Sequence, residues 1–100
     1  MGTANIQFEL SSLYKEEVDH IQFVSEDVLV SEDQKSIRQK QLAKALNLGH
    51  MEKSKSKIVF ATNEGLKKLE SMVFGMDDHE VLLKAGIYIP IHSICHVAVL

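Results

Sequence analysis

The chain contains no tryptophan, one proline and one cysteine. The lone cysteine, Cys95, excludes an internal disulfide, so the fold must depend on an apolar core. No uninterrupted apolar run exceeds about five residues, far short of the ~20 that a membrane-spanning helix requires. The first residues also lack the basic flank and apolar core of a secretory signal. We therefore expect a cytoplasmic protein without a membrane partner.

The composition provides enough apolar material for one domain. With 100 residues and 45% apolar content, the chain can bury a core without a metal or disulfide, so we predict a single domain over residues 1–100. The net charge is −3, but residues 31–57 hold seven bases against three acids, and both flanking segments are acidic. This central segment is the candidate for contact with an anion.

The first 30 residues combine two patterns. Residues 5–10 alternate polar and apolar side chains, which predicts a strand. Between residues 14 and 28, apolar side chains recur at steps of three and four, which favours a helix. The β-branched character of residues 20–24 and 28–30 keeps an extended segment as the alternative.

Residues 32–48 carry the signals of an amphipathic helix. Ser31 and Gln34 form a capping pair, and Glu32 and Asp33 lie in the first turn, where the helix dipole favours negative charge. Gly49 offers a residue that can end the helix. The predicted apolar face consists of Ile37, Leu42, Ala45, Leu46 and Leu48. On this interpretation, Leu48→Asp should unfold the protein.

Residues 57–100 contain short strand-like runs separated by turn residues. Asn63-Glu64-Gly65 predicts a hairpin, and Gly75 predicts a bulge in the long run 66–76. Pro90 predicts an edge position because it cannot donate to a β-ladder. The changed spacing after Pro90 predicts a tight corner at His92-Ser93.

These elements predict an α+β fold. We expect a small, strongly bent antiparallel β-sheet or barrel of the SH3 or Sm-like type, packed against one amphipathic helix. The sheet should occupy residues 57–100, and an N-terminal strand and helix should occupy residues 1–30.

The order of a helix and five short strands, with a corner before the last strand, resembles that of Sm-like small β-barrels. The resemblance to their bacterial RNA-chaperone branch covers residues 39–97 and includes Gly65, Met76-Asp77, the strand residues 81–84 and His92. Met76 stands where that branch has an aromatic residue, and Pro90-Ile91 stands where it has Tyr-Lys. The resemblance implies RNA binding, with His92 as the residue retained from the RNA-contacting pair.

A second resemblance lies near the end of the chain. It is similar to small uncharacterised bacterial proteins that carry a Leu-Lys-x-Gly-x-x-Ile-Pro-Ile-His pattern. Here the pattern is formed by Leu83, Lys84, Gly86, Ile89, Pro90, Ile91 and His92. This similarity implies no activity.

The residues with reactive or metal-binding side chains form no complete site in the sequence. His92, Cys95 and His96 lack the second ligand pair of a zinc site, so we expect neither a metal nor a cofactor. An enzyme with a Cys95 nucleophile would need a histidine and an orienting group close to it in space. Residues 77–80 contain acids and a histidine, which we interpret as a tight turn.

Three function classes remain open. The first is a non-catalytic interaction module that forms a homo-oligomer through its edge strands. The second is a single-stranded RNA-binding protein, and the third is a small enzyme that uses Cys95 and a histidine. The predicted RNA contacts are Lys40, Lys44, Lys53, Lys55, Lys57 and His92.

Overall fold

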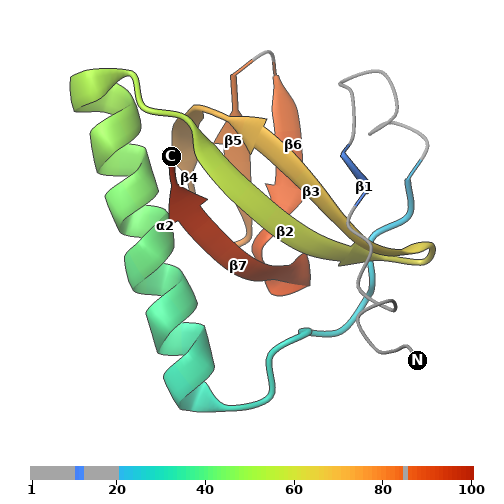
Figure 1. Ribbon diagram of the computed structural model, residues 1–100. Helices are drawn as coiled ribbons and strands as arrows, with labels where there is room; N and C mark the ends of the chain where they lie inside the picture. Colours follow the sequence, from blue (N-terminus) through green and yellow to red (C-terminus); the bar gives the residue numbers. More distant parts are fainter. Residues whose placement is uncertain (1–10, 13–20, 85) are drawn as a thin grey trace, which may run out of the picture.

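The chain folds into one long helix packed against two small β-sheets (Figure 1). The computed structural model describes residues 11–12, 21–84 and 86–100. The elements in chain order are β1 (Ser11–Ser12), α2 (Glu32–Glu52), β2 (Ser56–Thr62), β3 (Gly65–Ser71), β4 (Val73–Met76), β5 (Glu80–Leu83), β6 (Ile87–Pro90), the 3₁₀ turn η2 (Ile91–Ser93) and β7 (Ile94–Val99). The predicted α+β class is confirmed.

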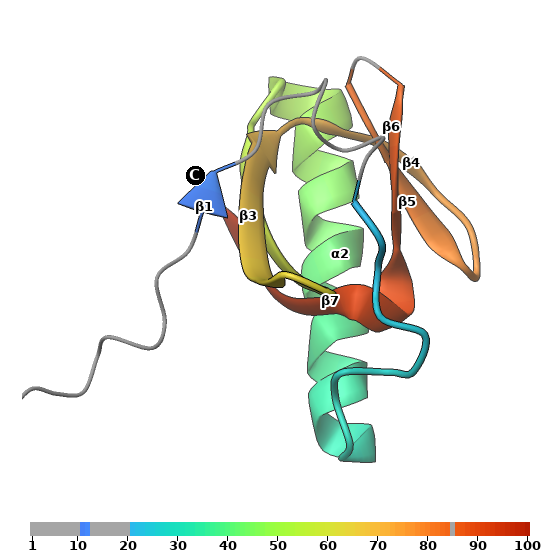
Figure 2. The ribbon, with the colours of Figure 1, turned by 90° about the vertical axis from the view of Figure 1, so that its right-hand side faces the viewer.

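The two sheets have strand orders β1-β3-β2-β7 and β4-β5-β6. Neighbouring strands are antiparallel, except that β1 runs parallel to β3. Figure 2 shows the sheets on opposite sides of the molecule, and α2 packs against β7 of one sheet and β4 of the other. Among the described residues, no strand pairing joins the two sheets into a closed barrel.

Helix α2 begins as the sequence predicts and ends later. The Ser31 Oγ accepts the Gln34 N–H at 3.1 Å. The predicted end at Gly49 is wrong, because the helix continues to Glu52 and is capped by Lys53 in the left-handed conformation, φ 59°. Gly49 is buried inside the helix, where an added Cβ would lie 2.7 Å from the Val73 carbonyl oxygen. The glycine therefore permits close packing of α2 against β4.

The buried face of α2 differs from the predicted apolar face. Leu42 and Ala45 are buried as expected, but Ile37 is 54% exposed and Leu48 is only half-buried. Leu48 is therefore not the centre of the interface, and the expectation that Leu48→Asp unfolds the chain loses its basis. Leu42, which is fully buried, takes that place, and Leu42→Ala should cost about 2–5 kcal/mol.

The core lies between the helix and the two sheets. Its buried side chains are Leu42, Ala45, Ile58, Phe60, Leu69, Val73, Val81, Leu83, Ile87, Ile89, Ile91, Ile94 and Val97. Alternate residues of β5 and β6 point inward, so the residues between them face outward. No helix in the described part of the chain is long and apolar enough to cross a bilayer.

Residues 21–30 form an extended segment, so the helix favoured for residues 14–28 is wrong over this part. The Val24 N–H donates to Ala61 O, and Phe23 forms an isolated bridge to Thr62. The Phe23 ring packs on Phe60 with a centroid distance of 5.6 Å. Pairing to a distant strand thus outweighs the local helical spacing. Residues 14–20 and the strand predicted at residues 5–10 lie outside the described residues.

The turn predictions for the second half of the chain are confirmed. Asn63 and Glu64 connect β2 to β3, and Gly65 has a positive φ of 107°. The register of β4 shifts between Val73 and Gly75, as a bulge requires. Pro90 ends the edge strand β6, and η2 forms the corner before β7. Strand β2 begins at Ser56, one residue before the predicted boundary.

Candidate binding surface

Three lysines from separate parts of the chain surround one hollow. Its lining residues are Lys53, Lys55, Glu70, Ser71, Met72 and Lys84, and its volume is about 440 Å³. We call it the lysine hollow. All three lysine side chains are exposed, whereas Met72 is buried.

The local fold explains why these lysines meet. Lys53 caps α2, and its N–H donates to Leu48 O; Lys55 precedes β2. Lys84 follows β5, and its N–H donates to Met72 O at 2.9 Å. The helix end, the start of β2 and the end of β5 are thereby gathered around the β3–β4 connection.

The charges of the lysine hollow are unbalanced. Among the described residues, Glu70 is the one acid in its lining, against three lysines. None of the three ammonium groups lies within 4 Å of a carboxylate among the residues that the structure describes. An anionic group would therefore find cations there that are not already engaged in ion pairs.

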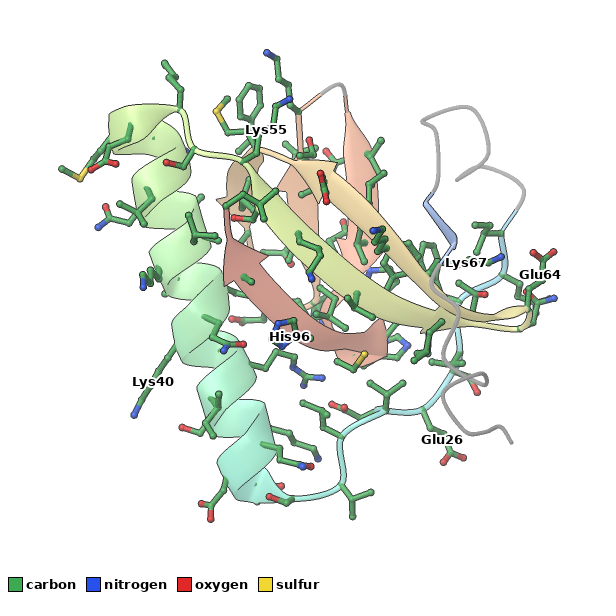
Figure 3. The ribbon with its side chains drawn as sticks, viewed as in Figure 1. Glu26, Lys40, Lys55, Glu64, Lys67 and His96 are labelled. Atoms are coloured by element: carbon green, nitrogen blue, oxygen red, sulfur yellow. The ribbon has the colours of Figure 1, made fainter. Side chains whose placement is uncertain are left out.

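The other predicted lysines lie elsewhere. Lys57 is half-buried within β2, opposite Glu70 and Ala98. Lys40 and Lys44 are exposed on α2, and Figure 3 shows Lys40 pointing away from the sheets, far from Lys55. The predicted set therefore does not form one site, and only Lys53 and Lys55 of that set line the hollow.

His92 faces a different part of the molecule. Its Nε2 lies 2.6 Å from Val24 O, so the half-buried ring ties η2 to the extended segment. It lines a separate hollow together with Asp27, Arg38 and residues of the β4–β5 turn. The arrangement does not bring His92 together with the lysine hollow.

Arg38 and Asp27 form the best-connected ion pair, and the sequence interpretation missed it. The Arg38 guanidinium contacts Asp27 through two hydrogen bonds of 2.9 and 2.8 Å and donates a third to Ile94 O. Arg38 is 6% exposed, and its Nε has no partner in the described structure. The hydrogen bond from Arg38 holds the pKa of Asp27 below its usual value, against the opposing effect of desolvation. This pair fastens the extended segment to α2.

Cys95 is a structural thiol in this arrangement. Its Sγ lies 3.5 Å from Val59 O, and burial raises the pKa of the thiol. The neighbouring His96 is exposed on β7. A thiol with a raised pKa is mostly protonated at neutral pH, which disfavours it as a nucleophile.

The acidic turn between β4 and β5 is held by its own backbone. The Asp77 Oδ1 accepts the N–H groups of His79 and Glu80 at 2.7 and 2.8 Å, and these bonds lower the Asp77 pKa. The turn interpretation is confirmed. Across the described ranges, no group of three or more His, Cys, Asp or Glu side chains could hold a metal ion.

A second surface feature lies on the outer face of the β4-β5-β6 sheet. Gly75, Leu82 and Tyr88 are aligned across its three strands, with Phe74 next to Gly75. Phe74 is 44% and Tyr88 53% exposed. We call Phe74, Leu82 and Tyr88 the aromatic strip. The alternation Ile87-Tyr88-Ile89 could have predicted the outward direction of Tyr88, but its alignment with Leu82 requires the register.

Comparison of the chain with protein-family models, curated proteins and solved structures finds no match in any of the three.

Proposed function

We propose that the chain is a non-catalytic interaction module that self-associates through the outer edge of β6. The observation that carries this proposal is the unpaired edge of that strand. Among the described residues, β6 pairs with β5 alone, and its Tyr88 side chain is largely exposed. An unpaired strand edge offers backbone donors and acceptors to another strand.

The register identifies which backbone groups point outward. The Ile91 N–H donates to His79 O, directly across the ladder, so this is a hydrogen-bonded pair. The alternation of an antiparallel ladder then turns the N–H and C=O of Tyr88 away from β5. Pro90, two residues later, has no N–H, and its carbonyl accepts the Ser93 hydroxyl. The available edge is therefore short and centred on Tyr88.

The other strand edges are partly occupied. The Phe74 carbonyl of β4 lies 2.7 Å from His50 Nε2 of α2. On β7, Ile94 O accepts from Arg38, and α2 lies beside the strand (Figure 1). The short strand β1 covers part of β3. These contacts favour β6 as the site of association.

Light scattering at micromolar protein concentration tests this proposal. We expect a dimer or larger assembly. Tyr88→Pro removes the outward N–H but no bond to β5, so it should yield monomers. The matched control Tyr88→Thr retains the N–H and a good strand residue, so it should preserve the assembly. A monomeric parent chain, or a Tyr88→Pro variant that assembles normally, would contradict the proposal.

A second candidate function, binding of single-stranded RNA, is favoured by the lysine hollow. Lys53, Lys55 and Lys84 offer positive charge at one place, without an ion pair to any residue of the described ranges, despite the negative net charge of the chain. Binding should weaken steeply between about 50 mM and 200 mM salt, because phosphate contacts release counterions. Lys53→Glu combined with Lys55→Glu should abolish it. The absence of binding at low salt would rule out this candidate.

We also propose that the chain resembles Sm-like proteins and is located in the cytoplasm. After α2 the chain forms six strands, β2–β7, with η2 before the last one, where the resemblance implies five strands and a corner; the shared order of helix, strands and corner supports this part of the proposal. The departures at Met76 and Pro90-Ile91, with His92 bonded to Val24 O, favour a chain that does not use the RNA contacts of that family.

A further inference from the structure

We infer that the lysine hollow and the aromatic strip form one continuous site for single-stranded nucleic acid, in which lysines contact phosphates and aromatic rings stack on bases. This inference rests on the second candidate function above and extends it. The sequence interpretation placed the nucleic acid on residues 40–57 and His92, where no aromatic side chain is available.

The backbone connects the two surfaces directly. Met72 lines the lysine hollow, and Phe74 follows it two residues later on β4. On β5, Lys84 lines the hollow two residues after Leu82, which faces Tyr88. The Lys84 N–H to Met72 O bond fixes these two connections side by side.

The direction of the aromatic side chains follows from burial. Val73 is fully buried, and Phe74 beside it is 44% exposed. Tyr88 is 53% exposed between the buried Ile87 and Ile89. Both rings are therefore on the outer face of the same sheet. Two strand spacings separate β4 from β6, so the two backbones lie about 10 Å apart.

The combination of charge and rings favours nucleic acid over other anions. A free phosphate or an acidic peptide would use the lysines but would have no use for two exposed rings. Bases stack on aromatic side chains with little dependence on sequence, and a basic groove beside them holds the backbone. Glu70 lines the lysine hollow, and Glu80 lies at the start of β5; both carboxylates repel phosphates. Binding should therefore be weak and strongly dependent on salt.

Fluorescence anisotropy of a short labelled adenine homopolymer RNA tests the inference on the full chain. Lys53→Glu with Lys84→Glu should abolish binding at low salt. Lys40→Glu with Lys44→Glu makes the same change of net charge on the outer side of α2 and should leave most of it. Phe74→Ala and Tyr88→Ala should each weaken binding at least about fivefold, whereas Tyr88→Phe should not.

The outcomes separate this inference from the candidate function beneath it. Loss of binding in the Lys53 and Lys84 variant with unchanged binding in Phe74→Ala and Tyr88→Ala would overturn the continuous site and leave the lysine hollow as the RNA contact. Equal losses of binding in the Lys53 and Lys84 variant and in the Lys40 and Lys44 variant would overturn both the continuous site and RNA binding by the lysine hollow. The absence of any binding by the original chain would do the same. If the alanine variants alter the oligomeric state but not RNA binding, the aromatic strip is an interface between copies, and the inference is wrong. Thermal unfolding of each variant checks that the fold is retained.

Discussion

The two ends of helix α2 carry positive charge in opposite ways. Near its start, Arg38 is 6% exposed, holds Asp27 through two hydrogen bonds and donates to a carbonyl of β7. Past its end, Lys53 is exposed beside Lys55 and Lys84, and none of them forms an ion pair within the described structure. The buried charge holds segments of the fold together, whereas the exposed charges are free to contact a ligand.

The largest expected difference is in stability. Arg38→Ala should lower the free energy of unfolding by about 3 kcal/mol, because it removes both Arg38 bonds to Asp27 and the Arg38 bond to the Ile94 carbonyl, and leaves the Asp27 carboxylate only the Leu29 N–H as a donor in the described structure. Lys40→Ala, on the exposed side of the same helix, is the matched control and should change it by less than about 0.5 kcal/mol. Urea unfolding measures both values. Equal effects would show that the Arg38 pair does not stabilise the fold.

A smaller expected difference is in the dependence of stability on pH. The Asp27 pKa is lower in the folded chain than in the unfolded chain, so the pair stabilises the fold fully above the unfolded value of about 3.9. This stabilisation is lost as the pH falls below that value, through the lowered folded pKa. Asp77 also has a lowered pKa, so the stability of an Asp27→Asn variant will still depend on pH. The contribution of Asp27 is therefore the difference between the pH profiles of the original chain and of Asp27→Asn. The acid-induced loss of stability should be shallower in Asp27→Asn, and an identical slope would contradict the assignment.

The smallest expected effect is at the other end of the helix. Lys84→Glu should change the free energy of unfolding by no more than about 0.5 kcal/mol, because the lysine is exposed and forms no ion pair with any residue of the described ranges. Urea unfolding of this variant beside Arg38→Ala completes the comparison. A loss as large as that expected for Arg38→Ala would mean that the lysine hollow is part of the structural framework.

The features that could be predicted from the sequence are those with local causes. The Ser31 cap, the hairpin at Asn63-Glu64 and the η2 corner each depend on residues within a few positions of one another. The end of α2 was mispredicted because Gly49 is required by the Val73 carbonyl, which lies on another element. The helix favoured for residues 14–28 was wrong over residues 21–28, because their pairing partners lie in and beside β2 and in η2.

The candidate site was only partly predictable for the same reason. Lys53 and Lys55 were identified from the basic segment, but Lys84 joins them only because β5 ends beside Met72. The role of Arg38 depends on Ile94, 56 residues away along the chain. No periodicity or local spacing contains that information.

The helix stops on a lysine held at φ 59°, a conformation that glycine adopts without steric cost. Selection for stability alone would favour glycine at this position, with a gain of about 1 kcal/mol. The same exchange would remove an ammonium group from one wall of the lysine hollow. Engineering for thermal stability would therefore favour glycine at position 53, whereas engineering for ligand binding would favour the lysine.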